Sequence, residues 1–187
     1  MFKKHLSFWV LLVLVGMVWS CSTTKKGVFN RQYHALTTKY NVLFNGKEAF
    51  AVGDAILGQA FEENFYELLP VEPINLRGEN FDETTIVPGF DRAEEKAVKA
   101  IQKHSIKIDE TQYNSQIDEA YLLLGKARYF DRRFFPALEA FNFLLESGAN
   151  PSVYTEGKIW REKTNIRLNN VELAVENLGP LVQSLTS

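Results

Sequence analysis

The spacing of small and large apolar residues between positions 118 and 148 is the feature that most constrains how this chain can fold. Gly125 and Ala137 stand twelve positions apart, and bulky apolar residues lie close to each of them in the sequence. Glycine and alanine let two helices approach closely, and larger neighbours fill the space around such a crossing. We therefore expect two antiparallel helices that cross at these small residues. The predicted packing residues are Tyr121, Leu124, Gly125, Ala137 and Phe141.

The same positions resemble the tetratricopeptide repeat (TPR), a helical hairpin that carries an aromatic residue, Leu-Gly, Ala and Phe at these separations. Pro136 suits the start of the second helix, where its missing N–H costs little, and Ser147-Gly148 suits its end. The resemblance implies an all-α fold in which TPR-like helical hairpins form a short α-solenoid. Residues 91–187 are assigned to these repeats, with Asn169-Asn170 as the last turn and a final helix that ends before Gly179-Pro180.

Two further segments precede the repeats. Apolar residues recur at helical spacing on both sides of the turn signal Asn45-Gly46, so residues 31–68 are predicted to form an antiparallel helical hairpin. Prolines and glycines then interrupt every period, which predicts an irregular insertion over residues 69–90. Helical spacing resumes at Asp91, a predicted N-cap, and reaches Ile108. The first hairpin's predicted apolar stripes are Tyr33, Leu36, Tyr40, Leu43 and Phe44, then Phe50, Gly53, Leu57, Ala60, Phe61, Phe65 and Leu68.

The N-terminus has the organisation of a bacterial signal peptide. A basic start precedes 12 uncharged residues from Phe8 to Trp19, fewer than the roughly 20 needed to span a hydrocarbon core. Residues 1–20 are therefore predicted to be a signal peptide that is removed. The alternative is an N-terminal anchor that stays uncleaved.

Cys21 directly follows this segment and is the single cysteine of the chain. Val18-Trp19-Ser20-Cys21 resembles a lipobox, in which the cysteine thiol receives the lipid. A lone thiol in an oxidising compartment would be a liability, and acylation, for example with palmitate, removes it. We expect lipidation at Cys21 and a polar lipidated tether over residues 21–30. By resemblance to bacterial lipoproteins, the lack of aspartate after the cysteine implies transfer to the outer membrane. By resemblance to surface lipoproteins of Bacteroidota, which tend to carry acidic export signals here, the lack of an acidic cluster implies that the protein faces the periplasm.

The sequence carries no recognisable catalytic or metal-binding pattern. His34 and His104 stand in no metal-ligand spacing. Where two acidic residues are adjacent in the sequence, their carboxylates point about 100° apart on a helix and cannot share one substrate. Nucleophile-elbow, P-loop and dinucleotide-binding motifs are missing. A formal net charge of −2 gives no field that would attract nucleic acid. We predict a protein that is not an enzyme and has no cofactor, metal, nucleic acid or small-molecule substrate.

Three stretches, together with the lipobox, resemble a known family. Residues 31–46, 99–105 and 120–129 are similar to the N-terminal part of the SprE/PorW lipoproteins of Bacteroidota. The resemblance implies a TPR-containing lipoprotein of the type IX secretion system, which serves gliding motility and adhesin export. Its partners would be other secretion proteins. The alternative is a generic TPR lipoprotein that serves another envelope complex, such as outer-membrane assembly or peptidoglycan enzymes.

Solenoids usually bind partners on the concave surface lined by the first helix of each pair. Lys126, Arg128 and Tyr129 are the predicted partner-binding residues on that helix of the 118–148 repeat. Arg128 replaces the tyrosine that the repeat prefers, so a packing position carries a charge. The alternative is that Arg128 only extends over the neighbouring hairpin.

Overall fold

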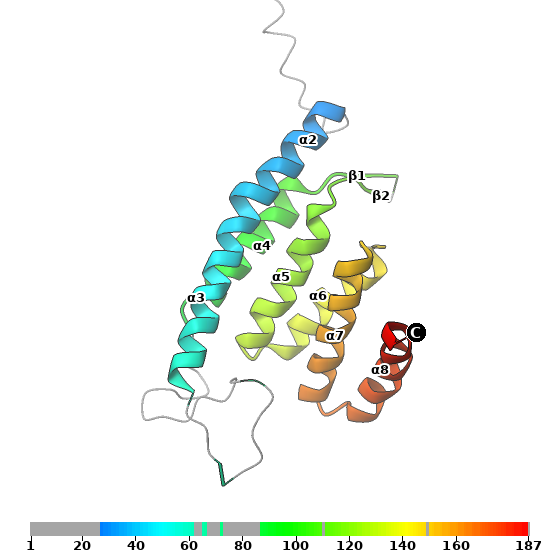
Figure 1. Ribbon diagram of the computed structural model, residues 1–187. Coiled ribbons are helices and arrows are strands. Elements are labelled where there is room, and N and C mark those ends of the chain that lie inside the picture. Colours follow the sequence, from blue (N-terminus) through cyan, green and yellow to red (C-terminus); the bar gives the residue numbers. More distant parts are fainter. Residues whose placement is uncertain are drawn as a thin grey trace, which may run out of the picture.

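The computed structural model describes residues 27–61, 65–66, 72, 87–109, 111–148 and 150–186. These residues form a row of helices packed side by side, with one very short β-hairpin (Figure 1). The predicted all-α class is therefore confirmed. The predicted signal peptide, Cys21 and most of the tether and of the 69–90 insertion lie outside the described residues.

The first unit is one unbroken helical run rather than a hairpin. Helix α2 (Val28–Thr37) continues through a π-helical segment, η1 (Thr38–Leu43), into α3 (Phe44–Ala60), along one side of the molecule (Figure 1). The predicted turn at Asn45-Gly46 and the hairpin over 31–68 are therefore wrong. Gly46 is needed for a close approach instead, because a Cβ there would lie 2.9 Å from Leu123 Cδ2.

The buried side of this helix also differs from the predicted stripe. Tyr33, Leu36, Tyr40 and Phe44 are more than half exposed, and only Leu43 of that stripe is buried. The helix instead turns its smaller residues inward, because a side with glycines and alanines lets it lie closest to its neighbours. The first part of the second predicted stripe agrees with the structure, because Gly53 and Leu57 are buried. The buried residues of the run are Thr38, Val42, Leu43, Gly46, Ala49, Gly53 and Leu57.

Helix α4 (Phe90–His104) begins and ends differently from the prediction. Gly89, with φ of +113°, precedes the helix, and Asp91 lies in its first turn, where its Oδ1 accepts the Gly89 N–H at 3.1 Å. Asp91 is therefore not the N-cap. The helix stops at His104, and Ile108 lies on strand β1 (Lys107–Ile108), which pairs antiparallel with β2 (Thr111–Gln112). The Gln112 Oε1 accepts the Ile106 N–H at 2.9 Å and so supports this hairpin.

Helices α5 (Gln116–Phe130) and α6 (Phe134–Glu146) form the hairpin over the predicted 118–148 segment. A Cβ on Gly125 would lie 2.3 Å from Phe141 Cε1, so the aromatic ring packs directly on the glycine backbone. Ala137 and Phe141 are fully buried, Leu124 is 5% exposed, and Tyr121 is half-buried. The small residues of the sequence pattern therefore lie where the two helices are in close contact.

Helices α7 (Pro151–Arg167) and α8 (Val171–Thr186) complete the row. The turn at Asn169-Asn170 is present, with Asn169 at φ of +64°. The predicted end before Gly179-Pro180 is wrong, because α8 continues through Pro180. Pro180 is exposed, so water can satisfy the carbonyl that loses its helical partner. Exposure thus lets the helix tolerate a residue that usually stops it.

The core lies between successive helices of the row. Where α4 faces α5, the fully buried residues are Ala93, Ala97, Ala100, Ala120 and Ala127. Side chains this small allow the two backbones to lie close together. A second cluster, around Phe90, Tyr129, Phe130 and Phe141, fills the space toward α6 and α7 with aromatic rings.

Candidate protein-interaction groove

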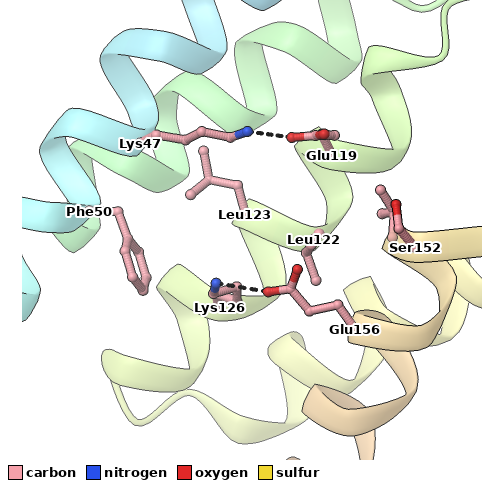
Figure 2. A pocket seen from close by; sticks show the side chains of 9 residues that line it. Lys47, Phe50, Glu119, Leu122, Leu123, Lys126, Ser152 and Glu156 are labelled. Atoms are coloured by element: carbon pink, nitrogen blue, oxygen red, sulfur yellow. Dashed lines mark hydrogen bonds and ion pairs between the residues drawn. The ribbon is translucent and has the colours of Figure 1, made fainter. Parts of the chain in front are cut away.

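Helices α3, α5 and α7 line a groove of about 260 Å³ on one side of the row (Figure 2). We call it the α3/α5/α7 groove. Its floor is apolar, and its rim carries lysine and glutamate side chains. The lining residues are Lys47, Phe50, Glu119, Leu122, Leu123, Lys126, Ser152, Val153 and Glu156. The groove therefore combines an apolar floor with charges of both signs, a combination suited to a peptide surface.

Two ion pairs cross the groove and connect its three helices (Figure 2). Lys47 on α3 binds Glu119 on α5, and Lys126 on α5 donates to Glu156 Oε1 on α7 at 3.1 Å. The Lys126 ammonium also lies 5.1 Å from the centre of the Trp160 ring, within the range of a cation–π contact. Since these pairs are partly exposed, water and salt weaken them. Such pairs can exchange for pairs with an incoming ligand.

The structure places the three predicted partner-binding residues in different surroundings. Lys126 lines the groove. Tyr129 is 1% exposed, so it is not a surface contact, and the prediction for it is wrong. Its hydroxyl donates to Glu72 Oε2 at 2.8 Å and accepts from Arg167 Nε at 3.2 Å. Tyr129 faces inward because the ring fills the aromatic cluster under α7.

Arg128 extends over neighbouring helices, as the alternative to a partner-binding role expects. Its Nε donates to Glu94 Oε1 on α4 at 2.8 Å, and its Nη1 donates to the Pro136 carbonyl on α6 at 3.1 Å. Arg133 also binds Glu94, so one carboxylate holds two guanidinium groups. Burial alone would raise the Glu94 pKa, but the bonds from Arg133 and Arg128 outweigh it and hold that pKa below 4.5. This cluster ties α4 to the α5–α6 hairpin.

The lowered Glu94 pKa leads to a prediction about acid stability. Because the folded pKa lies below the unfolded one, the stabilisation is complete above about pH 4.5 and is lost as the pH falls through the folded value. We expect Glu94→Gln to lower the free energy of unfolding at pH 7 by about 1 kcal/mol and to flatten its decline in acid. Urea unfolding at pH 7 and in acid measures both effects. The exposed Glu139→Gln on α6 is the control, and an equal acid slope for Glu94→Gln and the parent would contradict the prediction.

Sequence reasoning missed most of the groove. It selected neighbouring positions on α5, whereas the positions that line the groove follow the helical period: Glu119, Leu122, Leu123 and Lys126. That period was visible in the sequence. The contributions of α3 and α7 were not: the predicted hairpin over 31–68 misplaced α3, and no spacing along the chain shows that α7 lies beside α5.

A second cavity, of about 320 Å³, lies among the β-hairpin, α5 and α6. Tyr121 stacks on Phe143 there, with ring centres 4.3 Å apart. Burial raises the pKa of Asp118, although its carboxylate accepts the Asn150 N–H, and burial also raises the pKa of Tyr121. The stacked rings of Tyr121 and Phe143 line one side of this cavity.

Glu162 is the one acidic side chain among the buried residues that the structure describes. Sequence spacing puts it opposite Ala174, in a slot where the repeat prefers a small residue. Its Oε1 accepts from Arg161 Nε at 2.6 Å and from Asn177 Nδ2 at 3.2 Å, and its Oε2 accepts from Asn165 Nδ2 at 2.7 Å. The bond from Asn177 joins α8 to Glu162 on α7, and the other two lie within α7.

Across the described parts of the chain, no group of three or more His, Cys, Asp and Glu residues is placed to hold a metal ion. His34 and His104 do meet, with their Nδ1 atoms 3.0 Å apart, and this contact joins α2 to α4. Among the helices the structure describes, none combines the length and the apolar character that a membrane span requires. Neither a protein-family model nor a curated protein matches this chain.

Proposed function

We propose that this protein is a non-catalytic scaffold that binds a segment of a partner protein in the α3/α5/α7 groove. The observation that carries the proposal is the groove itself: an apolar floor of Phe50, Leu122 and Leu123, bordered by exchangeable lysine–glutamate pairs. An apolar side chain of the partner would occupy the floor, and polar groups beside it would bind the rim. The helices supply a rigid surface for such a segment.

The proposal includes a TPR-like solenoid on a lipid anchor. The contact between Gly125 and Phe141 in the α5–α6 hairpin supports the repeat assignment, because the TPR pattern brings residues of these types together. The lipobox at Cys21 supports acylation and attachment to the outer membrane on its periplasmic side. Resemblance to SprE/PorW supports a place in the type IX secretion and gliding apparatus. A TPR adaptor of another envelope complex is the second candidate.

Capture of partner proteins in the native host tests the groove. Ser152 is exposed at the edge of the groove on α7, so Ser152→Arg would insert a long charged side chain without disturbing the core. We expect this variant to reduce chemical cross-linking to its partners several-fold. Ser184→Arg on α8 is the control, since Ser184 is also an exposed serine on a helix and its hydroxyl also donates a local hydrogen bond.

Circular dichroism of both variants checks that the helices are retained. Undiminished cross-linking of Ser152→Arg with retained helicity would contradict the groove as the binding site. Mass spectrometry of the captured proteins distinguishes the two envelope assignments: type IX components support the first, and outer-membrane assembly proteins or peptidoglycan enzymes support the second.

A further inference from the structure

The outer side of the α2–η1–α3 helix carries a row of large apolar side chains. We call it the aromatic row: Phe29, Tyr33, Leu36, Tyr40 and Phe44. Their exposed fractions are 87%, 63%, 57%, 61% and 55% in that order. A single exposed apolar residue is ordinary, but a contiguous set marks an interaction surface. This row is separate from the α3/α5/α7 groove and shares no residue with it.

The row runs along one side of the helix. Its members are three or four residues apart, the spacing that repeats on one helical face. Thr38, on the opposite side, is fully buried. The helix thus packs on α4 and α5 with one side and leaves the aromatic side outward. Packing among the described residues leaves these large apolar side chains exposed.

The segment that carries the row is mainly basic, although Glu48 stands four residues after Phe44 and Lys47 pairs with Glu119 in the groove. Residues 22–47 contain five lysines and arginines and no aspartate or glutamate, although the whole chain has a net charge of −2. Lys39 lies beside the row, with its ammonium 5.3 Å from the centre of the Tyr40 ring. Basic residues flanking exposed aromatic rings are the composition of helices that lie on anionic lipid. Tyrosine suits this position because its ring enters the apolar region while its hydroxyl stays in contact with water.

Helix α8 provides an internal comparison. Val175 and Val182 are as exposed as the members of the row, at 64% and 57%. Residues 171–187, however, contain two glutamates and no lysine or arginine. Anionic lipid would repel that helix. Of these two exposed sets, the one on α2 to α3 has charges complementary to an anionic surface, and the one on α8 does not.

We infer that the aromatic row lies on an anionic phospholipid surface and holds the α2–η1–α3 helix against the membrane. The inference rests on the proposed lipid anchor, because Cys21 precedes Val28 by seven residues and an extended chain of that length spans at most about 25 Å. The anchor confines this helix to the membrane surface, and the row orients it there. The α3/α5/α7 groove would then be held at a constant orientation to the membrane.

A fluorophore on introduced cysteines tests this inference in the full acylated chain. Because Cys21 is the one cysteine and its thiol is consumed by the lipid, each introduced thiol is the single labelling site. Tyr33→Cys and Val175→Cys are matched, being 63% and 64% exposed. In vesicles of phosphatidylcholine with phosphatidylglycerol, we expect iodide to quench the label at 33 several-fold less than the label at 175. The difference in quenching between the two positions should shrink in vesicles of phosphatidylcholine alone and after Lys39→Glu. Lys99→Glu on α4 should leave that difference unchanged.

Equal iodide quenching at positions 33 and 175 in the anionic vesicles would overturn the inference. So would protection of position 33 in detergent together with a cross-linked dimer, because a second copy would then cover the row. The mass of the N-terminal peptide reports acylation separately. If Cys21 carries no lipid, the anchor proposal fails, and the same cysteine variants, labelled in a Cys21→Ala background and added to preformed vesicles, still decide whether the row binds anionic lipid.

Discussion

Replacing Gly125 by leucine is expected to lower the free energy of unfolding by about 3 kcal/mol, the upper part of the range for overpacked cores. Even the first added carbon would lie 2.3 Å from Phe141 Cε1, and Phe141 is fully buried, so the ring has little room to move. Ala137→Leu, on the facing helix, should destabilise in the same direction. Denaturant midpoints measured on the full chain give these values.

Glu139→Ala is the control, because Glu139 is exposed on α6 and its loss should change stability by no more than about 0.5 kcal/mol. Unchanged midpoints for both Gly125→Leu and Ala137→Leu would mean that the α5–α6 crossing is not as close as the structure has it. The TPR-like assignment would then lose its main support.

Cys21→Ala is expected to abolish acylation and to release or mislocalise the protein. Each buried methylene of a lipid chain contributes about 0.8 kcal/mol of membrane affinity, so loss of the acylated cysteine removes most of the attachment. Incorporation of radiolabelled palmitate, followed by membrane fractionation, measures the effect. Ser22→Ala, one residue further on, should keep the label.

Palmitate label on Cys21→Ala, or its absence from the parent protein, would contradict the lipoprotein proposal. If the variant loses the label yet stays partly with the membrane, iodide quenching at position 33 distinguishes two causes. Protection there indicates attachment through the aromatic row, and free quenching indicates an uncleaved N-terminal segment.

Local rules of spacing account for the elements that the sequence predicted correctly. Small residues at helix crossings and turn-forming residues act within a few positions of themselves, so the α5–α6 hairpin and the Asn169-Asn170 turn could be read directly. The same rules failed at Asn45-Gly46 and at Gly179-Pro180. Both pairs are common in turns, yet one lies inside the long α2–η1–α3 helix and the other inside α8.

These failures have a common physical reason. A glycine can serve either a turn or a close approach, and only the neighbouring helices show which: Gly46 is pressed against Leu123, from a helix far along the chain. The apolar stripe of the first helix was wrongly predicted to be buried for a similar reason. Helical period identifies residues that share a face, but it does not show whether that face is buried. The exposed aromatic row is such a face.

The residues of the candidate groove likewise include some that the sequence could place and others that only the tertiary structure shows. From sequence alone, Lys126 could be placed on the first helix of a hairpin, where solenoids present their binding surface. Tyr129 and Arg128, only two or three residues further on, belong to the interior and to the Glu94 cluster, because each residue advances about 100° around the helix. Partners from α3 and α7 were beyond sequence spacing altogether.

By itself, the sequence determined the helical class, the α5–α6 hairpin and its packing residues, because these depend on residue size at fixed local spacing. Tertiary structure alone decided that residues 28–60 form one helix, that its aromatic side faces outward, and that α3, α5 and α7 enclose a groove. Those outcomes depend on which surfaces of distant helices fit together. Close packing of glycines and alanines selects that fit, and no local pattern encodes it.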